Sequence, residues 1–327
     1  MCVFCNQRSI SGKQSFRRKS VIEEIEAALA TLPVESEAEI AFFGGSFTGI
    51  DRELMIYLLD VAKGYVEYPK QGMARITGIR MSTRPDYIDR EIMDILAIYP
   101  VKTVELGLQS MDDEVLRLSG RGHTAADAEN ACRMIKAAGY SLIGQMMIGL
   151  PGGNLENELM TAEKICEMGA DGARIYPTVT FYGTPLAEMA ERGEYKMLSL
   201  DDAVCRSKEV LKIFEREGVE CIRIGLCASD NLMDESLVMG GANHPALGEL
   251  VMGELYYDNI RELFLKSGER MSFKDKKMYI SVPKGMLSRA IGQNGRNRDR
   301  LIDEFELKSL KISETAQLSA ITVNHYE

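Results

Sequence analysis

The amino-acid sequence predicts an α/β protein with a parallel sheet or barrel, followed by a small α+β unit near the C-terminal end. Short apolar runs that end in Gly, Pro or Ser alternate with longer amphipathic stretches, which is typical of right-handed βαβ units. The chain has 327 residues, enough for one large domain or two smaller ones. Strands are expected at 39–43, 76–82, 103–108, 141–148, 173–181 and 221–226.

Helices are expected between these strands, and several carry capping signals. Ser20, with Glu23 three residues later, indicates a capping box for a helix that reaches residue 32. Asp51 is expected to cap a helix over 52–63. Further helices are expected at 86–98, 124–138, 154–168 and 201–217. Ligands in parallel α/β folds bind at the carboxyl ends of the strands, so the loops there are expected to hold the functional residues.

From residue 273 onward the pattern is that of a separate unit. Its elements are expected to be strands at 277–282 and 307–312, helices at 284–290 and 298–306, and a tight loop at 292–295. We therefore expect two domains, 1–265 and 273–327.

Charge is unevenly distributed along the chain. The net charge is −10, but the segment 261–311 holds 13 Lys and Arg residues against 7 Asp and Glu residues. An acidic body with a basic tail is one pattern of nucleic-acid-binding proteins, and a solvated basic surface is the other interpretation. No run of 18 apolar residues indicates a membrane span and no export signal is visible, so we expect a cytoplasmic protein.

Two of the seven cysteines stand apart from the others. Cys2 and Cys5 are close together among polar residues, which indicates metal or redox chemistry in a chain without export signals. Two thiolates alone complete neither a cluster nor a tetrahedral zinc site, so a pair of free thiols is the other interpretation. The remaining cysteines are expected to act as small apolar residues: Cys132, Cys166, Cys205, Cys221 and Cys227.

Ordered motifs at the expected strand ends carry a family resemblance. They are Cys2-Val3-Phe4-Cys5, Gly44-Gly45-Ser46-Phe47-Thr48, Ser82-Thr83-Arg84-Pro85-Asp86, Glu105-Leu106-Gly107-Leu108-Gln109-Ser110, Arg121-Gly122-His123-Thr124 and Gly149-Leu150-Pro151-Gly152. Over residues 1–265 this order resembles the radical S-adenosylmethionine (SAM) superfamily, in the branch of the Elongator catalytic subunit and the oxygen-independent coproporphyrinogen oxidases. The segments 174–177, 183–186 and 244–248 resemble the Elongator catalytic subunit in particular.

The resemblance implies a partial (β/α)6 barrel that holds a [4Fe-4S] cluster and SAM. Cys2 and Cys5 would be cluster ligands, and SAM would fill the iron site that no cysteine occupies. Reductive cleavage of SAM then gives a 5′-deoxyadenosyl radical, with a reductant such as flavodoxin or ferredoxin as a partner.

The resemblance also implies which residues contact SAM. They are Phe4, Gly44, Gly45, Ser46, Ser82, Gln109, Arg121, Gln145 and Leu150. The two glycines would meet the methionyl amine and Arg121 the methionyl carboxylate. For Ser82 and Gln145 the other interpretation is that they are inward-facing polar residues of the barrel without a ligand.

The sequence departs from the family at its beginning. The family's cluster motif is Cys-x3-Cys-x-aromatic-Cys, and Cys2, Phe4 and Cys5 match only its second half. The first cysteine and the first barrel strand would precede Met1. Either a preceding segment carries them, which we favour because the later motifs are intact, or the chain is a degenerate homologue.

The loop at 292–295 lies between two expected helices and resembles the Gly-x-x-Gly loop of a KH domain, which clamps the nucleic-acid backbone. This resemblance implies RNA contacts from Lys284, Gly292, Gln293, Asn294, Gly295 and Arg296, with Arg289, Arg298 and Arg300 as further phosphate-binding cations. A plain tight turn is the other interpretation.

Three functions follow as hypotheses. The first is a radical SAM enzyme that modifies RNA, in particular tRNA. The second is a radical SAM enzyme that acts on a small molecule, and the third is a catalytically silent RNA-binding homologue. Cluster loading separates the third from the others, and RNA binding separates the first from the second.

Overall fold

The structure is a computed structural model that describes residues 2–6, 18–226, 232, 234, 236–268, 273–316 and 321–325. Cys227 lies outside the described residues. The chain divides into two compact units, one formed by Met1–Ser199 with Val210–Asn243 and the other by Leu200–Glu209 with His244–Glu327. This division falls earlier than the boundary expected between residues 265 and 273. The reason is the long helix α10 (Leu247–Gly268), which was not expected and packs with the C-terminal helices.

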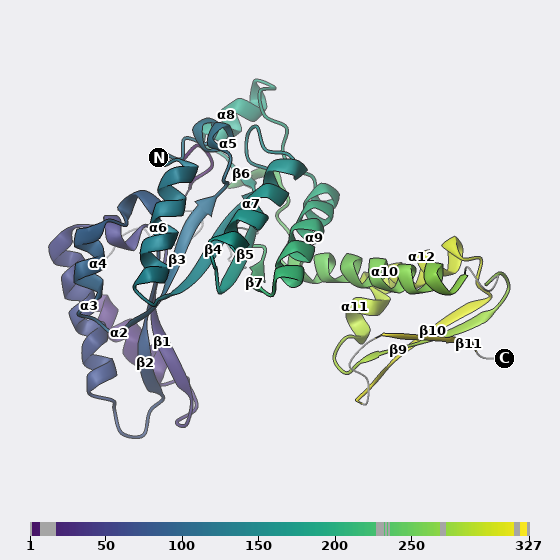
Figure 1. The fold of residues 1–327 in the computed structure, drawn as a ribbon, viewed down its shortest axis with the longest axis horizontal. Helices are drawn as coiled ribbons and strands as arrows, with labels where there is room; N and C mark the ends of the chain where they lie inside the picture. Colours follow the sequence, from purple (N-terminus) through teal and green to yellow (C-terminus); the bar gives the residue numbers. More distant parts are fainter. Residues whose placement is uncertain are drawn as a thin grey trace. The chain divides into compact units, whose positions relative to one another are not determined.

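The first unit is built on a parallel sheet of six strands that follow one another in chain order, as Figure 1 shows. The strands are β1 (Glu37–Phe42), β2 (Arg75–Thr83), β3 (Val101–Gln109), β4 (Ser141–Ile148), β5 (Gly172–Pro177) and β7 (Glu220–Ile224). Each neighbouring pair is parallel. The sheet curls into a half-barrel, which confirms the predicted partial α/β barrel, and the smaller α/β unit follows it.

One expected strand proves to be two. The strand expected at 173–181 breaks after Pro177, and β6 (Val179–Phe181) pairs antiparallel with β8 (Val238–Gly241) instead. Between β5 and β6, Thr178 donates both its N–H and its hydroxyl to the carbonyl of Ile148, at 2.9 and 2.7 Å. Proline has no N–H for the sheet ladder, so the chain can leave the barrel at this point without a lost hydrogen bond.

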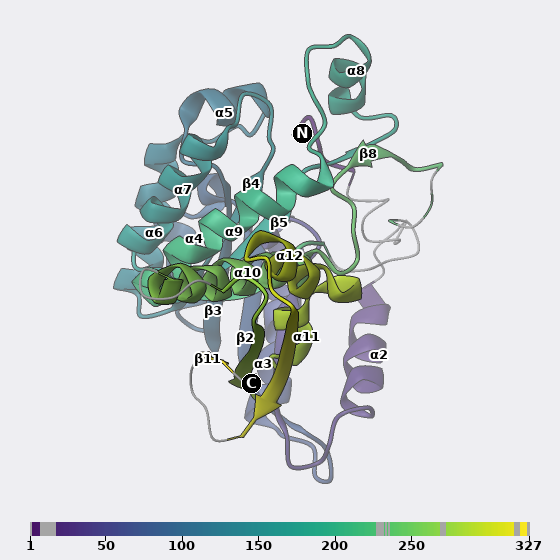
Figure 2. The same cartoon turned by 90° about the vertical axis from the view of Figure 1, so that its right-hand side faces the viewer.

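Helices follow the strands, and Figure 2 shows α4, α6 and α7 gathered on one side of the strands of the half-barrel. The described helices of this part are α2 (Arg18–Leu29), α3 (Arg52–Glu67), α4 (Arg90–Leu96), α5 (Asp113–Leu118), α6 (Ala125–Ala137), α7 (Leu155–Glu167), α8 (Pro185–Glu191) and α9 (Leu200–Glu217). The expected cap at Asp51 is confirmed, since its side chain accepts from the N–H of Leu54. Thr124 and Asn154 each form a complete capping box.

Two predicted helix starts are wrong. Helix α2 begins at Arg18, so Ser20 lies inside the helix rather than at its cap. The helix expected from residue 86 begins only at Arg90, because Asp89 caps it by accepting from the N–H of Ile92 at 2.8 Å. The carboxylate of Asp86 is instead bound on both oxygens by Arg84.

The second unit combines helices with a small mixed sheet. Its elements after α10 are β9 (Lys277–Pro283), α11 (Leu287–Ile291), the 3-10 turn η4 (Gln293–Gly295), α12 (Arg296–Glu304), β10 (Ser309–Thr315) and β11 (Thr322–His325). Strand β9 is central, parallel to β10 and antiparallel to β11.

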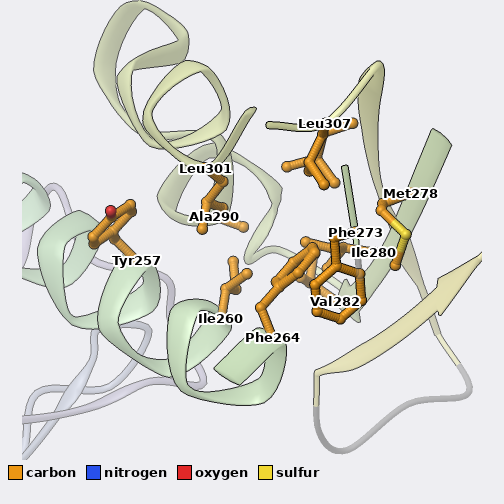
Figure 3. Packing of buried hydrophobic residues seen from close by; sticks show 11 residues of the cluster. Tyr257, Ile260, Phe264, Phe273, Met278, Ile280, Val282, Ala290, Leu301 and Leu307 are labelled. Carbon is orange, nitrogen blue, oxygen red and sulfur yellow. The ribbon is translucent and has the colours of Figure 1, made fainter. Parts of the chain in front are cut away.

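The core of this unit lies between α10 and the sheet (Figure 3). Ile260 and Phe264 of α10 lie beside Ile280 and Val282 of β9 in this cluster, and Tyr257 lies at its other end. The ring of Phe264 also stacks on the ring of Phe305, with centroids 4.8 Å apart. Helix α10 is therefore part of the C-terminal fold. No helix among the described residues is long and apolar enough to cross a membrane.

Candidate active site at the strand ends of the half-barrel

The carboxyl ends of β1 to β4 bring the predicted site residues to one edge of the sheet. In the strand register Ser82 lies opposite Glu105, and Gln145 lies opposite both Gly107 and Arg174. Alternate residues of a strand point to the same face, so the polar side chains of β2 to β5 share one face of the sheet. Parallel neighbours therefore assemble a site from segments far apart in sequence.

A turn at the N-terminal end holds both candidate cluster ligands. The N–H of Cys5 donates to the carbonyl of Cys2 at 3.1 Å, and the side chain of Cys2 is buried. Val3 fixes the turn by donating to Ser119 and accepting from Leu186, each at 3.0 Å. Phe4 occupies the same turn, half-buried. The turn that carries the two thiols is thus anchored to the residue after α5 and to the first turn of α8.

Arg121 connects the thiol turn to strand β3. Its Nη1 donates to the sulfur of Cys2 at 3.4 Å, and its Nη2 donates to the carbonyl of Gly107. A Cβ on Gly107 would lie 2.7 Å from that Nη2 and 2.8 Å from the side-chain nitrogen of Gln109, so a larger residue would have to displace the ends of these two side chains. The Nε of Arg121 is buried and has no hydrogen-bond partner among the described residues.

The glycine loop after β1 is open. Gly44 has φ 102°, a conformation that favours glycine, and a Cβ on Gly45 would meet nothing within 4 Å. Ser46 caps no helix with its side chain. The following turn is anchored by Thr48, whose hydroxyl lies 2.6 Å from that of Thr83. The loop therefore offers exposed backbone next to a fixed framework.

A buried carboxylate, which sequence reasoning missed, lies at the centre of the strand-end face. Glu105 is 1% exposed. It accepts from Arg174 Nε at 2.8 Å and Arg174 Nη2 at 3.2 Å, and Arg80 Nη2 lies 3.2 Å from its other side. The Nε2 of Gln145 donates to Glu105 at 3.0 Å and to Ser82 Oγ at 3.3 Å. The two predicted residues Ser82 and Gln145 are thus brought together through this carboxylate.

The pKa of Arg174 reflects both its burial and its partners in this network. Burial alone would lower the pKa of Arg174, but the hydrogen bonds to Glu105 and Tyr176 outweigh it, so the pKa is raised. The guanidinium of Arg174 also lies 5.9 Å from the ring centroid of the exposed Phe43, beside the glycine loop. A charged residue between apolar neighbours in a strand, as Glu105 is between Val104 and Leu106, is the signal that would have indicated this network.

His123 follows Arg121 and is held in its neutral form. Burial, together with the positive charge of Arg121, lowers the pKa of His123 to about 4. Its Nδ1 lies 3.9 Å from a carboxylate oxygen of Asp86, beyond hydrogen-bond range.

The loop after β4 is fixed by its backbone. Gly149 donates its N–H to the buried Glu158 at 2.7 Å and accepts from the hydroxyl of Tyr195 at 2.7 Å. The side chain of Leu150 is buried, so only the backbone of this residue is suited to meet a ligand.

The conformation of the Gly-x-x-Gly loop in the second unit is fixed by its glycines and by a buried asparagine. Gly292 and Gly295 have φ 77° and 81°, and a Cβ on Gly292 would lie 2.7 Å from the side chain of Asn297. Asn297 is buried and donates to the carbonyls of Gly253 and Arg289, at 2.7 and 3.2 Å. The loop tip, Gln293 and Asn294, is exposed.

The predicted cations around this loop fall into two groups. Arg289, Arg298 and Arg300 bind the carboxylates of Glu249, Asp299 and Glu254. Lys284 and Arg296 are exposed and form no ion pair among the described residues. The net positive charge near the loop is therefore smaller than the count of Lys and Arg residues in the sequence indicated, because three of the five cations are paired with carboxylates.

A curled parallel sheet with a thiol turn, a glycine loop and polar residues gathered at its strand ends defines a cofactor-binding half-barrel. The Radical SAM superfamily model matches residues 1–165 of the chain, and the Radical_SAM C-terminal domain model matches residues 170–257. The chain belongs to the radical SAM superfamily.

Several known proteins are similar to it. Elongator complex protein 3 of Homo sapiens is 27% identical over 67% of this chain and 42% of its own length. An uncharacterized protein of Methanocaldococcus jannaschii is 29% identical over 60% of this chain and 61% of its own. The chain thus spans about two fifths to three fifths of the length of these relatives. The structure of Elp3 from Methanocaldococcus infernus, with an N-terminal deletion, matches 78% of this chain and 59% of its own, with a TM-score of 0.59 and 22% identity, and shows the same fold.

Proteins of this superfamily bind a [4Fe-4S] cluster and SAM, and the residues present fit both groups. The thiols of Cys2 and Cys5, in one turn, are the donor type that iron–sulfur clusters require. The described residues contain no group of three or more His, Cys, Asp and Glu side chains that could hold a metal ion. The open loop at Gly45 and the polar strand ends fit a polar ligand such as SAM.

Proposed function

We propose that this protein is a radical SAM enzyme that acts on RNA, with tRNA as the first candidate. When bound, the cluster supplies the electron that splits the sulfonium C–S bond of SAM into methionine and a 5′-deoxyadenosyl radical. The observation that carries the enzymatic part is the contact of the buried Arg121 with Cys2, which joins the thiol turn to the strand-end site.

We propose that the chain's own residues bind SAM as follows. The exposed backbone of Gly44 and Gly45 meets the methionyl group, as the open space at Gly45 allows. Ser82 and Gln145 bind from the sheet face. The turn that holds Phe4 and the backbone at Leu150 flank the adenine. Ser46 and Gln109 complete the site, with a flavodoxin- or ferredoxin-like protein as the external reductant.

The enzymatic part is tested by cluster loading and SAM cleavage. The chain, preceded by a segment that completes the Cys-x3-Cys-x-aromatic-Cys motif, is reconstituted anaerobically with iron and sulfide, and iron content and 5′-deoxyadenosine release after dithionite are measured. We expect iron bound to the wild type and to Cys205→Ser, which changes an exposed cysteine outside the site. Cys2→Ser and Cys5→Ser should each lose cluster and cleavage. Equal iron in all four proteins, or a folded wild type without iron, would overturn the assignment.

The RNA part is supported by the geometry of the second unit. Two helices enclose a Gly-x-x-Gly loop and are flanked by the parallel strands β9 and β10, an arrangement similar to that of a KH domain. The exposed tip at Gln293 and Asn294 lies close in sequence to Arg296, a cation free of ion pairs among the described residues. Backbone amides and a free cation are the groups that clamp phosphates.

RNA binding is tested by electrophoretic mobility shift with unmodified tRNA. The double variant Gln293→Asp with Asn294→Asp adds two negative charges at the exposed tip, and Kd should rise at least about tenfold. A matched control, Gln71→Asp with Asn130→Asp, makes the same change at exposed positions of the first unit and should leave Kd unchanged. If the tip variant binds tRNA as tightly as the control, the role of this loop in RNA binding is wrong. If the wild type cleaves SAM but does not bind tRNA, the RNA proposal fails and a small-molecule substrate is favoured.

A further inference from the structure

The buried carboxylate of Glu105 restricts how the amide of Gln145 can be oriented. An ionised carboxylate only accepts hydrogen bonds, whereas a glutamine amide has an accepting oxygen and a donating nitrogen. The Gln145 atom 3.0 Å from Glu105 Oε2 must therefore be Nε2, since the flipped amide would bring two acceptors together. The second N–H of the same nitrogen points to Ser82 Oγ at 3.3 Å.

The carboxylate itself is held in place from two other strands. Arg174 of β5 binds it through Nε and Nη2, and Arg80 of β2 approaches Oε1 at 3.2 Å. A carboxylate buried to this degree is retained only when paired, so Glu105 has no other low-energy position. The orientation of Gln145 is thereby fixed before any ligand arrives.

We infer that Glu105 is a positioning residue, which turns the amide of Gln145 so that its carbonyl oxygen accepts a hydrogen bond from SAM. With both N–H groups of Gln145 occupied, Oε1 is the atom left for a ligand, and the side chain is only half-buried. No described residue donates to this oxygen. The ligand group must be a donor, which in SAM means a ribose hydroxyl, the amino group of adenine or the methionyl ammonium. The inference rests on the proposed SAM site.

Equilibrium dialysis on the full chain tests it with two probes. S-adenosylhomocysteine carries all these donors, whereas 5′-methylthioadenosine carries the ribose hydroxyls and the adenine amino group but no ammonium. Glu105→Gln removes the acceptor-only partner and lets Gln145 flip, so Kd for S-adenosylhomocysteine should rise about fivefold. Gln145→Met, which keeps the size but has no acceptor, should raise it about tenfold. If 5′-methylthioadenosine is also bound more weakly, the contact is to the nucleoside part of SAM. If its binding is unchanged, the contact is to the ammonium.

The double variant distinguishes positioning from general support of the fold. If Glu105 acts through Gln145, Glu105→Gln should add nothing to Gln145→Met, whereas independent effects would multiply. The control Glu39→Gln removes a carboxylate that faces Arg80 at 3.7 Å but not Gln145, and should leave Kd unchanged. Unchanged binding in Glu105→Gln, with weaker binding in Gln145→Met, would overturn the positioning role alone. Unchanged binding in Gln145→Met would overturn the SAM contact as well.

Discussion

The guanidinium of Arg121 lies 3.4 Å from the sulfur of Cys2, although 119 positions separate the two residues in sequence. The contact holds the thiol turn against β3 and directs a positive charge toward a cluster ligand. The family resemblance also implies a contact between this arginine and the SAM carboxylate, which stays a prediction. Its buried Nε, unpartnered among the described residues, leaves a further donor at the site.

Replacing Arg121 should therefore loosen the cluster site. We expect Arg121→Met to lower the iron retained after anaerobic reconstitution and desalting by at least about half, because hydrogen bonds to charged groups contribute roughly 1.5–3 kcal/mol. The matched control is Arg117→Met, which removes an exposed arginine paired with Glu114. Equal iron in the two variants would show that the contact with Cys2 is not needed for loading.

An added methyl group at Gly107 should destabilise the half-barrel, because it would displace the ends of two buried side chains. The Cβ of alanine would lie 2.7 Å from Arg121 and 2.8 Å from Gln109, inside a buried strand. We expect Gly107→Ala to lower the free energy of unfolding by about 1–3 kcal/mol, as overpacking does. Urea denaturation measures the change. Gly64→Ala, inside helix α3 with open space around it, should instead stabilise by about 0.5–1 kcal/mol.

Local rules predicted the order of elements but not the network within the barrel. The parallel strands and the caps at Asp51, Thr124 and Asn154 follow from short-range patterns, and the structure confirms them. Helix α10 was missed because it belongs to a core that forms only with residues beyond 273. The pairing of Glu105 with Arg174 spans 69 positions, and no local pattern specifies such a partner.

The buried side chain of Asn297 should be essential for the stability of the second unit. Asn297→Ala removes donors to the carbonyls of Gly253 and Arg289 in a buried position, and the two acceptors would lose their partners. We expect a loss of about 2–3 kcal/mol in stability of this unit, together with weaker tRNA binding. Thermal unfolding and mobility shift check both effects. Gln293→Ala, at an exposed position of the same loop, is the control and should leave the stability unchanged.

The stability of the half-barrel should depend on pH through His123. Its pKa is about 4 in the folded chain and 6.5 without the fold, so between these values the unfolded chain binds the proton and the folded chain does not. The contribution of His123 is therefore fully present above pH 6.5 and is lost as the pH falls toward 4, by up to about 1.4 kcal/mol per pH unit. Urea unfolding of wild type and His123→Gln across this range isolates the effect, because the other titrating groups are shared. We expect the difference in stability between the two proteins to shrink or reverse in favour of His123→Gln at low pH. A difference that stays constant with pH would show that His123 does not titrate on unfolding in this range.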